Sequence, residues 1–139
     1  MADTLTPERR SALMARVGSR DTKPELVVRR ILHARGWRYR LHRKGLPGTP
    51  DLVFTTRRAV IFVNGCFWHG HSCRLGKLPK SRLDFWVPKL DANRKRDARM
   101  IAQLVESGWR VMTVWQCSLA DQQTALDNIE SFLRGSDSV

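Results

Sequence analysis

The chain has 139 residues and no low-complexity stretch, a size that predicts one compact domain with a core of its own. Lysine and arginine number 25 against 13 acidic residues, so the net charge is +12, and the excess lies before residue 110. A charge of this size favours nucleic acid as a partner over a membrane, because the sequence has no basic amphipathic helix with an aromatic-rich apolar face. The alternative is a surface whose charge only keeps the protein soluble.

Cysteine content and hydropathy indicate the compartment. The chain has three cysteines, no cleavable apolar leader and no apolar run that approaches the ~18 residues of a membrane span. We therefore expect a cytoplasmic, nucleoid-associated monomer that does not bind a membrane.

Two helices are predicted in the first part of the chain by their end signals. Thr6-Pro7-Glu8 begins a short, basic helix that ends at Gly18. Thr22-x-x-Glu25 is typical of a capping box, and it begins a second helix that ends at Gly36. Apolar residues four positions apart in this second helix predict that it packs on a core.

Three strands are expected next. Residues Trp37–Arg43 alternate apolar and basic side chains, so one face of this strand should meet a core while the other presents cations. Asp51–Phe54 and Ala59–Val63 are apolar segments joined by a turn at Thr55–Arg58, which predicts a hairpin. A loop punctuated by glycine and proline follows over residues 64–80.

A long helix, a strand and a closing helix complete the pattern. The long helix should begin at Ser81 or at Pro88, which otherwise marks a kink, and end at Ser107. Its inward stripe is expected to contain Ile101, Leu104 and Val105. Trp109–Trp115 is predicted as a buried strand and Leu119–Leu133 as a helix. The fold class is therefore α/β, a three-layer αβα sandwich with a short mixed central sheet.

Cysteine and histidine gather in one loop. Residues 66–73 read Cys-Phe-Trp-His-Gly-His-Ser-Cys, and Cys117 follows another apolar strand. Thiolate and neutral imidazole are preferred ligands of Zn²⁺, and a closed set of three cysteines and one histidine has no open position for a substrate. We therefore predict a structural zinc site whose ligands are Cys66, His71, Cys73 and Cys117. Spacing equally allows His69 as the ligand and His71 as the spare imidazole.

The chemistry is expected at Pro50-Asp51, at the start of the predicted hairpin. A carboxylate there, beside backbone carbonyls of the adjoining strand, can hold Mg²⁺ and support phosphodiester hydrolysis. His69, if it is not a zinc ligand, is the candidate general base. The alternatives are structural: Pro-Asp is common in turns, and Glu25 can serve the capping box alone.

Large apolar residues accompany the cations. Phe67, Trp68 and Trp86 occur in a loop or at a helix start, and Met14 and Val17 share a helix with several arginines. Such side chains can enter a DNA duplex and unstack it. The alternative for each of them is burial in the core.

Many of these segments occur in the order found in a known family. They are Arg10-Ser11, Met14, Asp21-Thr22-x-Pro24-Glu25, Leu46-Pro47-Gly48-x-Pro50-Asp51, Ile61-Phe62-x-x-Gly65-Cys66-Phe67-Trp68-His69, Phe85-Trp86, Arg96-Asp97, Gly108-Trp109-Arg110-Val111 and Trp115-x-Cys117. Over nearly its whole length the chain resembles the very-short-patch mismatch repair endonucleases, a branch of the PD-(D/E)xK nuclease superfold. The resemblance implies a DNA mismatch repair endonuclease that nicks duplex DNA 5′ to the thymine of a T·G mismatch, such as deamination of 5-methylcytosine leaves.

The resemblance also implies roles for individual residues. Asp51 would be the principal Mg²⁺ ligand with the Val63 carbonyl as a second, His69 the general base, and Glu25 a support for the metal-bound water network. The zinc ligands would be Cys66, His71, Cys73 and Cys117. The DNA contacts would come from Met14, Val17, Arg16, Arg20, Phe67, Trp68 and Trp86. The whole chain, 1–139, would be one domain: a basic DNA-binding helix over 1–20, a nuclease core over 21–117 and a C-terminal helix and tail over 118–139.

Two positions depart from the family pattern. Asn64 stands where relatives carry His or Asp, and Gln116 stands where Glu is usual. Asn64 cannot supply a charge or accept a proton, whether it arose by natural divergence or as a substitution that traps a substrate complex. Two alternatives therefore remain: a zinc-containing module that binds distorted DNA without cutting it, and a nuclease with another target. Accessory proteins of mismatch repair are further candidate partners.

Overall fold

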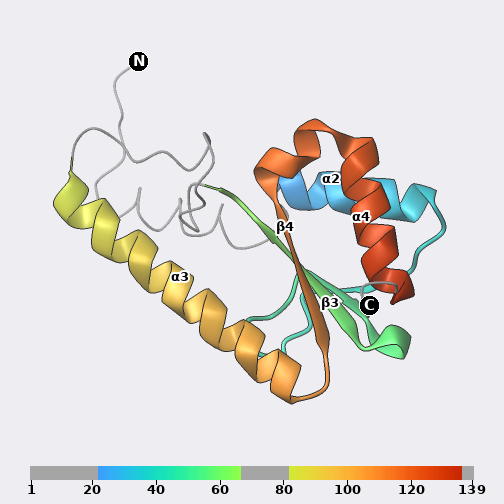
Figure 1. Ribbon diagram of the computed structural model, residues 1–139, viewed down its shortest axis with the longest axis horizontal. Coiled ribbons are helices and arrows are strands. Elements are labelled where there is room, and N and C mark those ends of the chain that lie inside the picture. The colour runs from blue at the N-terminus through green and yellow to red at the C-terminus, as the bar shows by residue number, and fades with distance from the viewer. Residues whose placement is uncertain (1–21, 67–81, 136–139) are drawn as a thin grey trace.

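The computed structural model describes residues 22–66 and 82–135 of the chain (Figure 1). Its elements in order are α2 (Lys23–Ala34), β1 (Arg40–Leu41), β2 (Leu52–Phe54), β3 (Ala59–Asn64), α3 (Leu83–Glu106), β4 (Arg110–Trp115) and α4 (Gln122–Arg134). The helix predicted near the N-terminus and most of the predicted zinc loop lie outside the described residues.

The four strands form one mixed sheet in the order β1-β2-β3-β4. β2 and β3 are antiparallel, with Leu52 opposite Ile61, and the turn between them contains Arg58 in the left-handed conformation. β3 and β4 are parallel, from Ala59 opposite Arg110 to Asn64 opposite Trp115. The predicted hairpin is confirmed, and α3 is the crossover that a parallel pair requires.

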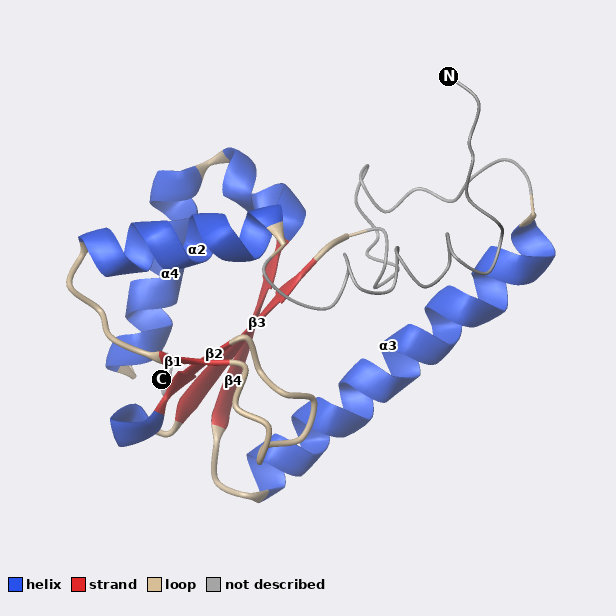
Figure 2. Cartoon of the chain, turned by 180° about the vertical axis from the view of Figure 1, so that it is seen from behind, coloured by secondary structure: helices blue, strands red, loops and turns tan. Residues whose placement is uncertain are grey.

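Helices cover both faces of the sheet, with α2 and α4 on one side and α3 on the other (Figures 1 and 2). Successive strand residues point to opposite faces, so Leu52 and Val53 enter different cores. The core under α2 and α4 contains Val28, Leu32, Leu52, Phe54, Ala59, Ile61, Val63, Val114, Leu126, Ile129, Phe132 and Leu133. The core under α3 contains Val53, Val60, Leu104 and Trp109. The predicted three-layer α/β arrangement is confirmed.

Helix α2 follows its sequence signals closely. The Thr22 hydroxyl accepts a hydrogen bond from the Glu25 backbone N–H at 3.4 Å, and Gly36 follows the helix with φ +88°. Val28 and Leu32, four positions apart, are fully buried against the sheet. This half of the capping box is therefore confirmed. It fixes the first turn of α2, from which the Glu25 side chain extends.

The strand predicted over Trp37–Arg43 is shorter than expected, because only Arg40 and Leu41 pair with β2. The alternation is correct for Trp37 and Tyr39, whose rings pack on Phe54 with centroid separations of 6.2 and 5.7 Å. Leu41 breaks the expected pattern, since it is 38% exposed on this edge strand.

The starts of the long helix and of the closing helix can be compared with the prediction. α3 begins at Leu83, close to the predicted start at Ser81, and Pro88 lies inside the helix rather than at its start. Leu104 is fully buried as predicted, but Val105 is 56% exposed because the next residue along a helix turns away from the contact face. α4 begins at Gln122 instead of Leu119, since Asp121 caps it and Gln116–Ala120 form a 3₁₀ turn.

The ends of β4 also differ slightly from the sequence prediction. Trp109 is buried but precedes the strand, and within the strand only Val114 is fully shielded while its neighbours are half-buried.

α3 is the longest described helix, yet within residues 22–66 and 82–135 no helix has the length and apolar character of a membrane span.

Candidate active site

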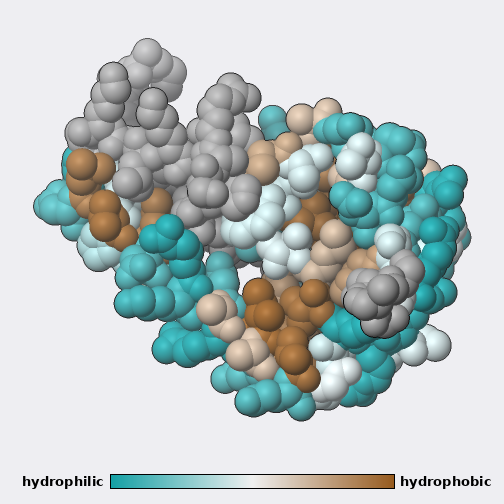
Figure 3. Space-filling model, in the orientation of Figure 1, coloured by the Kyte–Doolittle hydropathy of each residue, from teal (hydrophilic) through white to brown (hydrophobic). Residues whose placement is uncertain are grey.

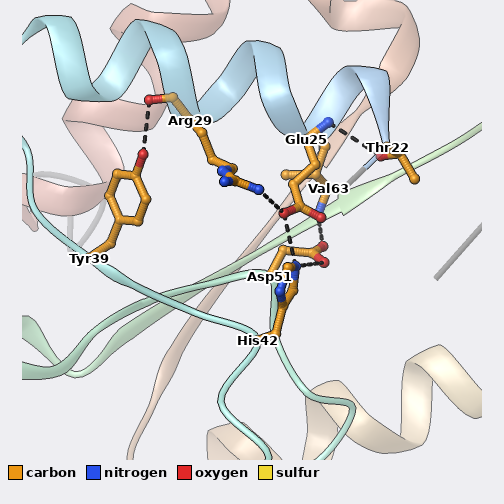
Figure 4. A network of polar contacts seen from close by, with 7 residues as sticks. All are labelled: Thr22, Glu25, Arg29, Tyr39, His42, Asp51 and Val63. Carbon is orange, nitrogen blue, oxygen red and sulfur yellow. Dashed lines mark hydrogen bonds and ion pairs between the residues drawn. The ribbon is translucent and has the colours of Figure 1, made fainter. Parts of the chain in front are cut away.

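Asp51 stands at the start of β2, beside the end of β3. It follows the buried Pro50, and its Oδ2 accepts a hydrogen bond from the Val63 backbone N–H at 2.7 Å (Figure 4). The side chain is almost fully buried, so this bond fixes the direction in which Oδ1 points. The expected position of Asp51 next to the end of the neighbouring strand is confirmed.

Glu25 reaches the same place from the first turn of α2. Its side chain is 1% exposed, and its Oε2 lies 3.1 Å from Arg29 Nη1 and 2.9 Å from His42 Nε2. A capping role alone does not explain this carboxylate, because it also contacts His42, which follows β1 and lies outside the helix (Figure 4). The structure therefore brings Asp51 and Glu25 together.

His42 completes the cluster, and it was not predicted as a site residue. Its Nε2 is 3.8 Å from Asp51 Oδ1, and one ligand atom from each of Glu25, His42 and Asp51 lies within 4.8 Å of the others. The register of β1 and β2 pairs Leu41 with Leu52, so His42 falls opposite Asp51. That register is the signal that would have found His42, and it could not be deduced from the alternating pattern alone.

A cleft of about 200 Å³ opens beside the two carboxylates. Glu25, Asp51, Val63 and Asn64 line one wall, and α3 supplies the other wall with Arg96, Asp97, Met100 and Ile101. The remaining lining residues are Thr22, Gly48, Thr49, Phe62 and Thr113. One wall of the cleft therefore offers oxygen atoms that could bind a metal ion, and the wall formed by α3 offers the cation of Arg96.

A glycine sets how closely the loop before β2 approaches α3. Gly48 has φ +75°, and a Cβ placed there would lie 2.8 Å from the Met100 Sδ. Only glycine adopts this conformation without strain and leaves room for Met100. The shape of the cleft near Asp51 depends on this contact.

Tyr39 supports the cluster from outside the cleft. Its hydroxyl donates a hydrogen bond to the Arg29 carbonyl oxygen at 3.0 Å. Burial raises the pKa of the Tyr39 hydroxyl, so it remains a donor well above neutral pH. The Arg29 backbone is thereby held while its guanidinium contacts Glu25.

Two predicted zinc ligands lie next to each other. Cys66 follows β3 and Cys117 follows β4, and the Cys117 backbone N–H donates to the Cys66 Sγ at 3.3 Å. The Cys66 N–H in turn donates to the Gln116 Oε1 at 3.4 Å. Two cysteines in contact suit the ligand preference of Zn²⁺, while His71 and Cys73 lie outside the described residues.

Of the other predicted site residues, Trp86 lies near the start of α3, and the rest lie outside the described residues. Trp86 is half-buried near the start of α3 and packs edge-to-face on Phe85 at 4.9 Å, and it does not line the described cleft. Hydrophobic surface appears at this end of the helix (Figure 3), where Leu83, Phe85 and Val87 are exposed. The predicted residues outside the described ranges are Met14, Arg16, Val17, Arg20, Phe67, Trp68, His69, His71 and Cys73.

Comparison with known proteins defines the class. The family described as DNA mismatch endonuclease Vsr matches residues 2–75. The type II nicking enzyme V.XorIIP of Xanthomonas oryzae pv. oryzae is 63% identical over 87% of this chain and 89% of its own length. The DNA mismatch endonuclease Vsr of Escherichia coli K12 is 42% identical over 91% of this chain and 81% of its own. The type II nicking enzyme V.NmeAIP of Neisseria meningitidis is 39% identical over 96% of each chain.

These relatives are DNA endonucleases by name, and they cover most of this chain. The chain belongs to the Vsr family.

Proposed function

We propose that this endonuclease nicks one strand of duplex DNA 5′ to the thymine of a T·G mismatch, by Mg²⁺-dependent hydrolysis of a phosphodiester. Membership of the Vsr family makes the protein a DNA-cleaving hydrolase. The observation that carries the proposed mechanism is the convergence of two buried carboxylates, Asp51 and Glu25, on one cleft. The mismatch is supported by the family description and by the printed name of the Escherichia coli relative.

The donor set of the cleft fits Mg²⁺. Mg²⁺ prefers oxygen ligands and is commonly held by one or two carboxylates. Asp51 lines the cleft and its carboxylate is fixed by the hydrogen bond from the Val63 N–H to Oδ2, and Val63 also lines the cleft. We propose Asp51 and the Val63 carbonyl as the residues that hold the ion. When bound, Mg²⁺ would polarise the scissile phosphate and stabilise charge on the leaving oxygen.

The other residues act on the attacking water and on the phosphate. Glu25 is held rigidly by Arg29 and His42, so it can orient water at the edge of the cleft. His69, in the undescribed segment that follows β3, is the proposed general base. Asn64 lines the cleft beside Val63 and can donate to a phosphate oxygen, although it cannot accept a proton.

The proposed DNA contacts come from two parts of the sequence, residues 14–20 and residues 67–86. The net charge of +12 supplies the attraction to phosphates, with Arg16 and Arg20 in the N-terminal segment. We propose that Met14 and Val17 enter the minor groove, and that Phe67, Trp68 and Trp86 form the aromatic wedge. The exposed apolar residues around Trp86 support the part of this proposal that the structure describes.

The wider assignment is part of the same proposal. It comprises a PD-(D/E)xK core over 21–117 within a single domain, a structural Zn²⁺ on Cys66, His71, Cys73 and Cys117, and a monomer that works on cytoplasmic, nucleoid-associated DNA. The three-layer fold with Pro50-Asp51 beside the end of β3 supports the core, and the adjacent Cys66 and Cys117 support the zinc.

A labelled duplex panel tests the proposal. Hemimethylated duplexes with T·G, each other mismatch, or matched pairs are incubated with Mg²⁺, and products are resolved by strand. We expect one nick, 5′ to the mismatched thymine, that is lost with a chelator and in Asp51→Asn. Equal cutting of matched duplexes would contradict the mismatch target. Binding without nicks under every metal and pH would contradict cleavage and favour a DNA-binding module.

A further inference from the structure

His42 lies between the two carboxylates of the active site without lining the cleft. Its Nε2 is 2.9 Å from Glu25 Oε2 and 3.8 Å from Asp51 Oδ1, and its side chain is 12% exposed. Glu25 and Asp51 both line the cleft. His42 therefore contacts the two acids from behind the surface that a substrate would meet.

The Nε2 of His42 lies within hydrogen-bond distance of Glu25, at 2.9 Å. With its hydrogen on Nε2, the ring donates to this carboxylate, which in its ionised form only accepts hydrogen bonds. A proton at this nitrogen leaves no lone pair there for a metal ion. The contact thus favours a role in orienting the acids over a role as a ligand.

The backbone of His42 is attached to the same site. Its N–H donates to the Asp51 carbonyl oxygen at 3.2 Å, and its φ is +48°. This left-handed conformation is uncommon outside glycine, although histidine adopts it more often than most residues. Such conformations persist where the surrounding structure holds them, and they gather at functional sites.

The contacts of His42 belong to one chain of supports that joins α2, β3 and the segments flanking β1 and β2 (Figure 4). The Tyr39 hydroxyl holds the Arg29 carbonyl, Arg29 and His42 hold Glu25, and the Val63 N–H holds Asp51. His42 is the member that touches both acids. Partners of this kind behind metal-binding side chains orient them and tune their affinity.

We infer that His42 is a positioning residue, which holds Glu25 and Asp51 in one relative orientation through its Nε2–H and its backbone. This inference rests on the proposed function, because it assigns His42 to the Mg²⁺-dependent nicking site. In this assignment His42 touches neither the substrate nor the metal. Its effect is carried by Asp51, which would hold the ion, and by Glu25, which would orient water.

Three substitutions in the full-length, zinc-loaded protein test the inference. His42→Asn tolerates the left-handed backbone, but its amide is too short to reach both acids. His42→Gln places an amide nitrogen with two hydrogens near the position of Nε2. His33→Asn is the matched control, since His33 is exposed at the other end of α2.

Two readouts are measured besides thermal unfolding. Mn²⁺ binding is followed without DNA from the electron paramagnetic resonance signal of the free ion, and nicking of a T·G duplex is followed under single turnover. We expect His42→Asn to lower both Mn²⁺ affinity and the nicking rate by about 10–100-fold. His42→Gln should recover a large part of each loss, and His33→Asn should match the unmodified protein.

The outcomes separate this inference from the proposed function. If His42→Asn binds Mn²⁺ and nicks like the unmodified protein, the positioning role is overturned. If His42→Asn unfolds early, the result for His42→Gln decides the question. A folded His42→Gln protein that loses Mn²⁺ affinity and nicking in full would show that the Nε2–H is not the essential group, and this would overturn the inference. If the unmodified protein does not nick a T·G duplex, the proposed function fails, while Mn²⁺ binding still tests His42.

A double substitution tests whether His42 acts through Glu25. We expect His42→Asn to lower Mn²⁺ affinity less in a Glu25→Gln background than in the unmodified protein, because one of its two acceptors has already been changed. Equal losses in both backgrounds would mean that the histidine acts independently of Glu25, and this too would overturn the inference.

Discussion

Asn64 is the residue whose side chain fits the proposed chemistry least well, because it carries no charge and cannot accept a proton. It ends β3, is nearly buried and lines the cleft beside Val63, so a side chain at this position faces the proposed site. An amide in that place supplies hydrogen bonds without charge. A carboxylate would add an oxygen ligand for the metal ion, and an imidazole would add a group that can carry a proton.

We therefore predict that Asn64→Asp or Asn64→His raises the Mg²⁺-dependent nicking rate. The initial rate on the T·G duplex measures the effect. Asn128→Asp makes the same chemical change at an exposed position on α4 and should leave the rate as it is. An unchanged or lower rate in both Asn64 variants would remove this position from the mechanism.

Gly48 gives a second prediction at the scale of one residue. Gly48→Ala adds a Cβ within 2.8 Å of Met100 Sδ at a φ of +75°, so the free energy of unfolding should fall by more than about 1 kcal/mol. Urea unfolding followed by circular dichroism measures it. Gly45→Ala is the matched control, because a Cβ there meets nothing within 4 Å and its φ is not positive. Equal effects of the two substitutions would contradict the close approach of this loop to α3.

The site was partly predictable at this scale. Asp51 was predicted from its place at the start of a strand beside the end of the next one, whereas the role of Glu25 came only from the family resemblance, because a capping box alone would explain this residue. His42 was not predicted, because its place opposite Asp51 depends on the register between β1 and β2, and alternation defines faces but not register. The roles of His69 and of the proposed wedge residues remain predictions, and of these residues only Trp86 lies within 22–66 and 82–135.

At the scale of the elements, α4 is attached to the end of α2 through one buried acid. Glu130 accepts hydrogen bonds from the Trp37 indole N–H at 2.9 Å and from Arg35 at 3.2 and 3.3 Å. These donors, the Trp37 bond first, lower the pKa of Glu130 below its usual value. The ionised form is therefore favoured in the folded protein, and this carboxylate ties α4 to the segment that leads into β1.

The lowered pKa of Glu130 predicts a pH-dependent stability. The stabilisation is fully present above the ordinary glutamate value of 4.5 and is lost as the pH falls through the lower folded value. Glu130→Gln should thus lower the free energy of unfolding by about 1–2 kcal/mol at neutral pH, and the difference should shrink in acid. Urea unfolding at several pH values measures it. Asp127→Asn, an exposed acid on the same helix, should show a smaller effect.

Element boundaries were predictable where a capping residue marks them. Thr22 and Gly36 bracket α2 as the sequence indicates. The start of α3 was predicted at either Ser81 or Pro88 because proline favours a helix start, and the helix begins at Leu83, near the first of these, with Pro88 inside it. The start of α4 was misplaced because apolar spacing in Gln116–Ala120 resembles a helix, while Asp121 is the residue that caps one.

At the scale of the whole molecule, the three layers followed from the order of elements, because a hairpin followed by a strand-helix-strand unit has few packings with both sheet faces covered. The approach of Cys66 to Cys117 follows from the same topology. β3 and β4 are parallel and end together at Asn64 and Trp115, so the residues that follow them meet. From the sequence, the proximity of Cys66 and Cys117 could be predicted only because both were expected to bind the same zinc ion.

At that meeting point, the proposed Zn²⁺ would constrain the whole fold. A structural Zn²⁺ contributes on the order of 10–16 kcal/mol, against a net stability of about 5–15 kcal/mol for a domain. A Zn²⁺ bound by both Cys66 and Cys117 would join the ends of β3 and β4, which α3 and the segment outside the described residues separate in the chain.

We predict that a strong chelator lowers the melting temperature markedly in a calorimetric scan, and that Zn²⁺ restores it while Mg²⁺ does not. Cys117→Ser should melt early with or without the chelator. A melting curve that the chelator leaves unchanged would exclude the proposed set of three cysteines and one histidine, and the stability of the sheet would then come from its two cores alone.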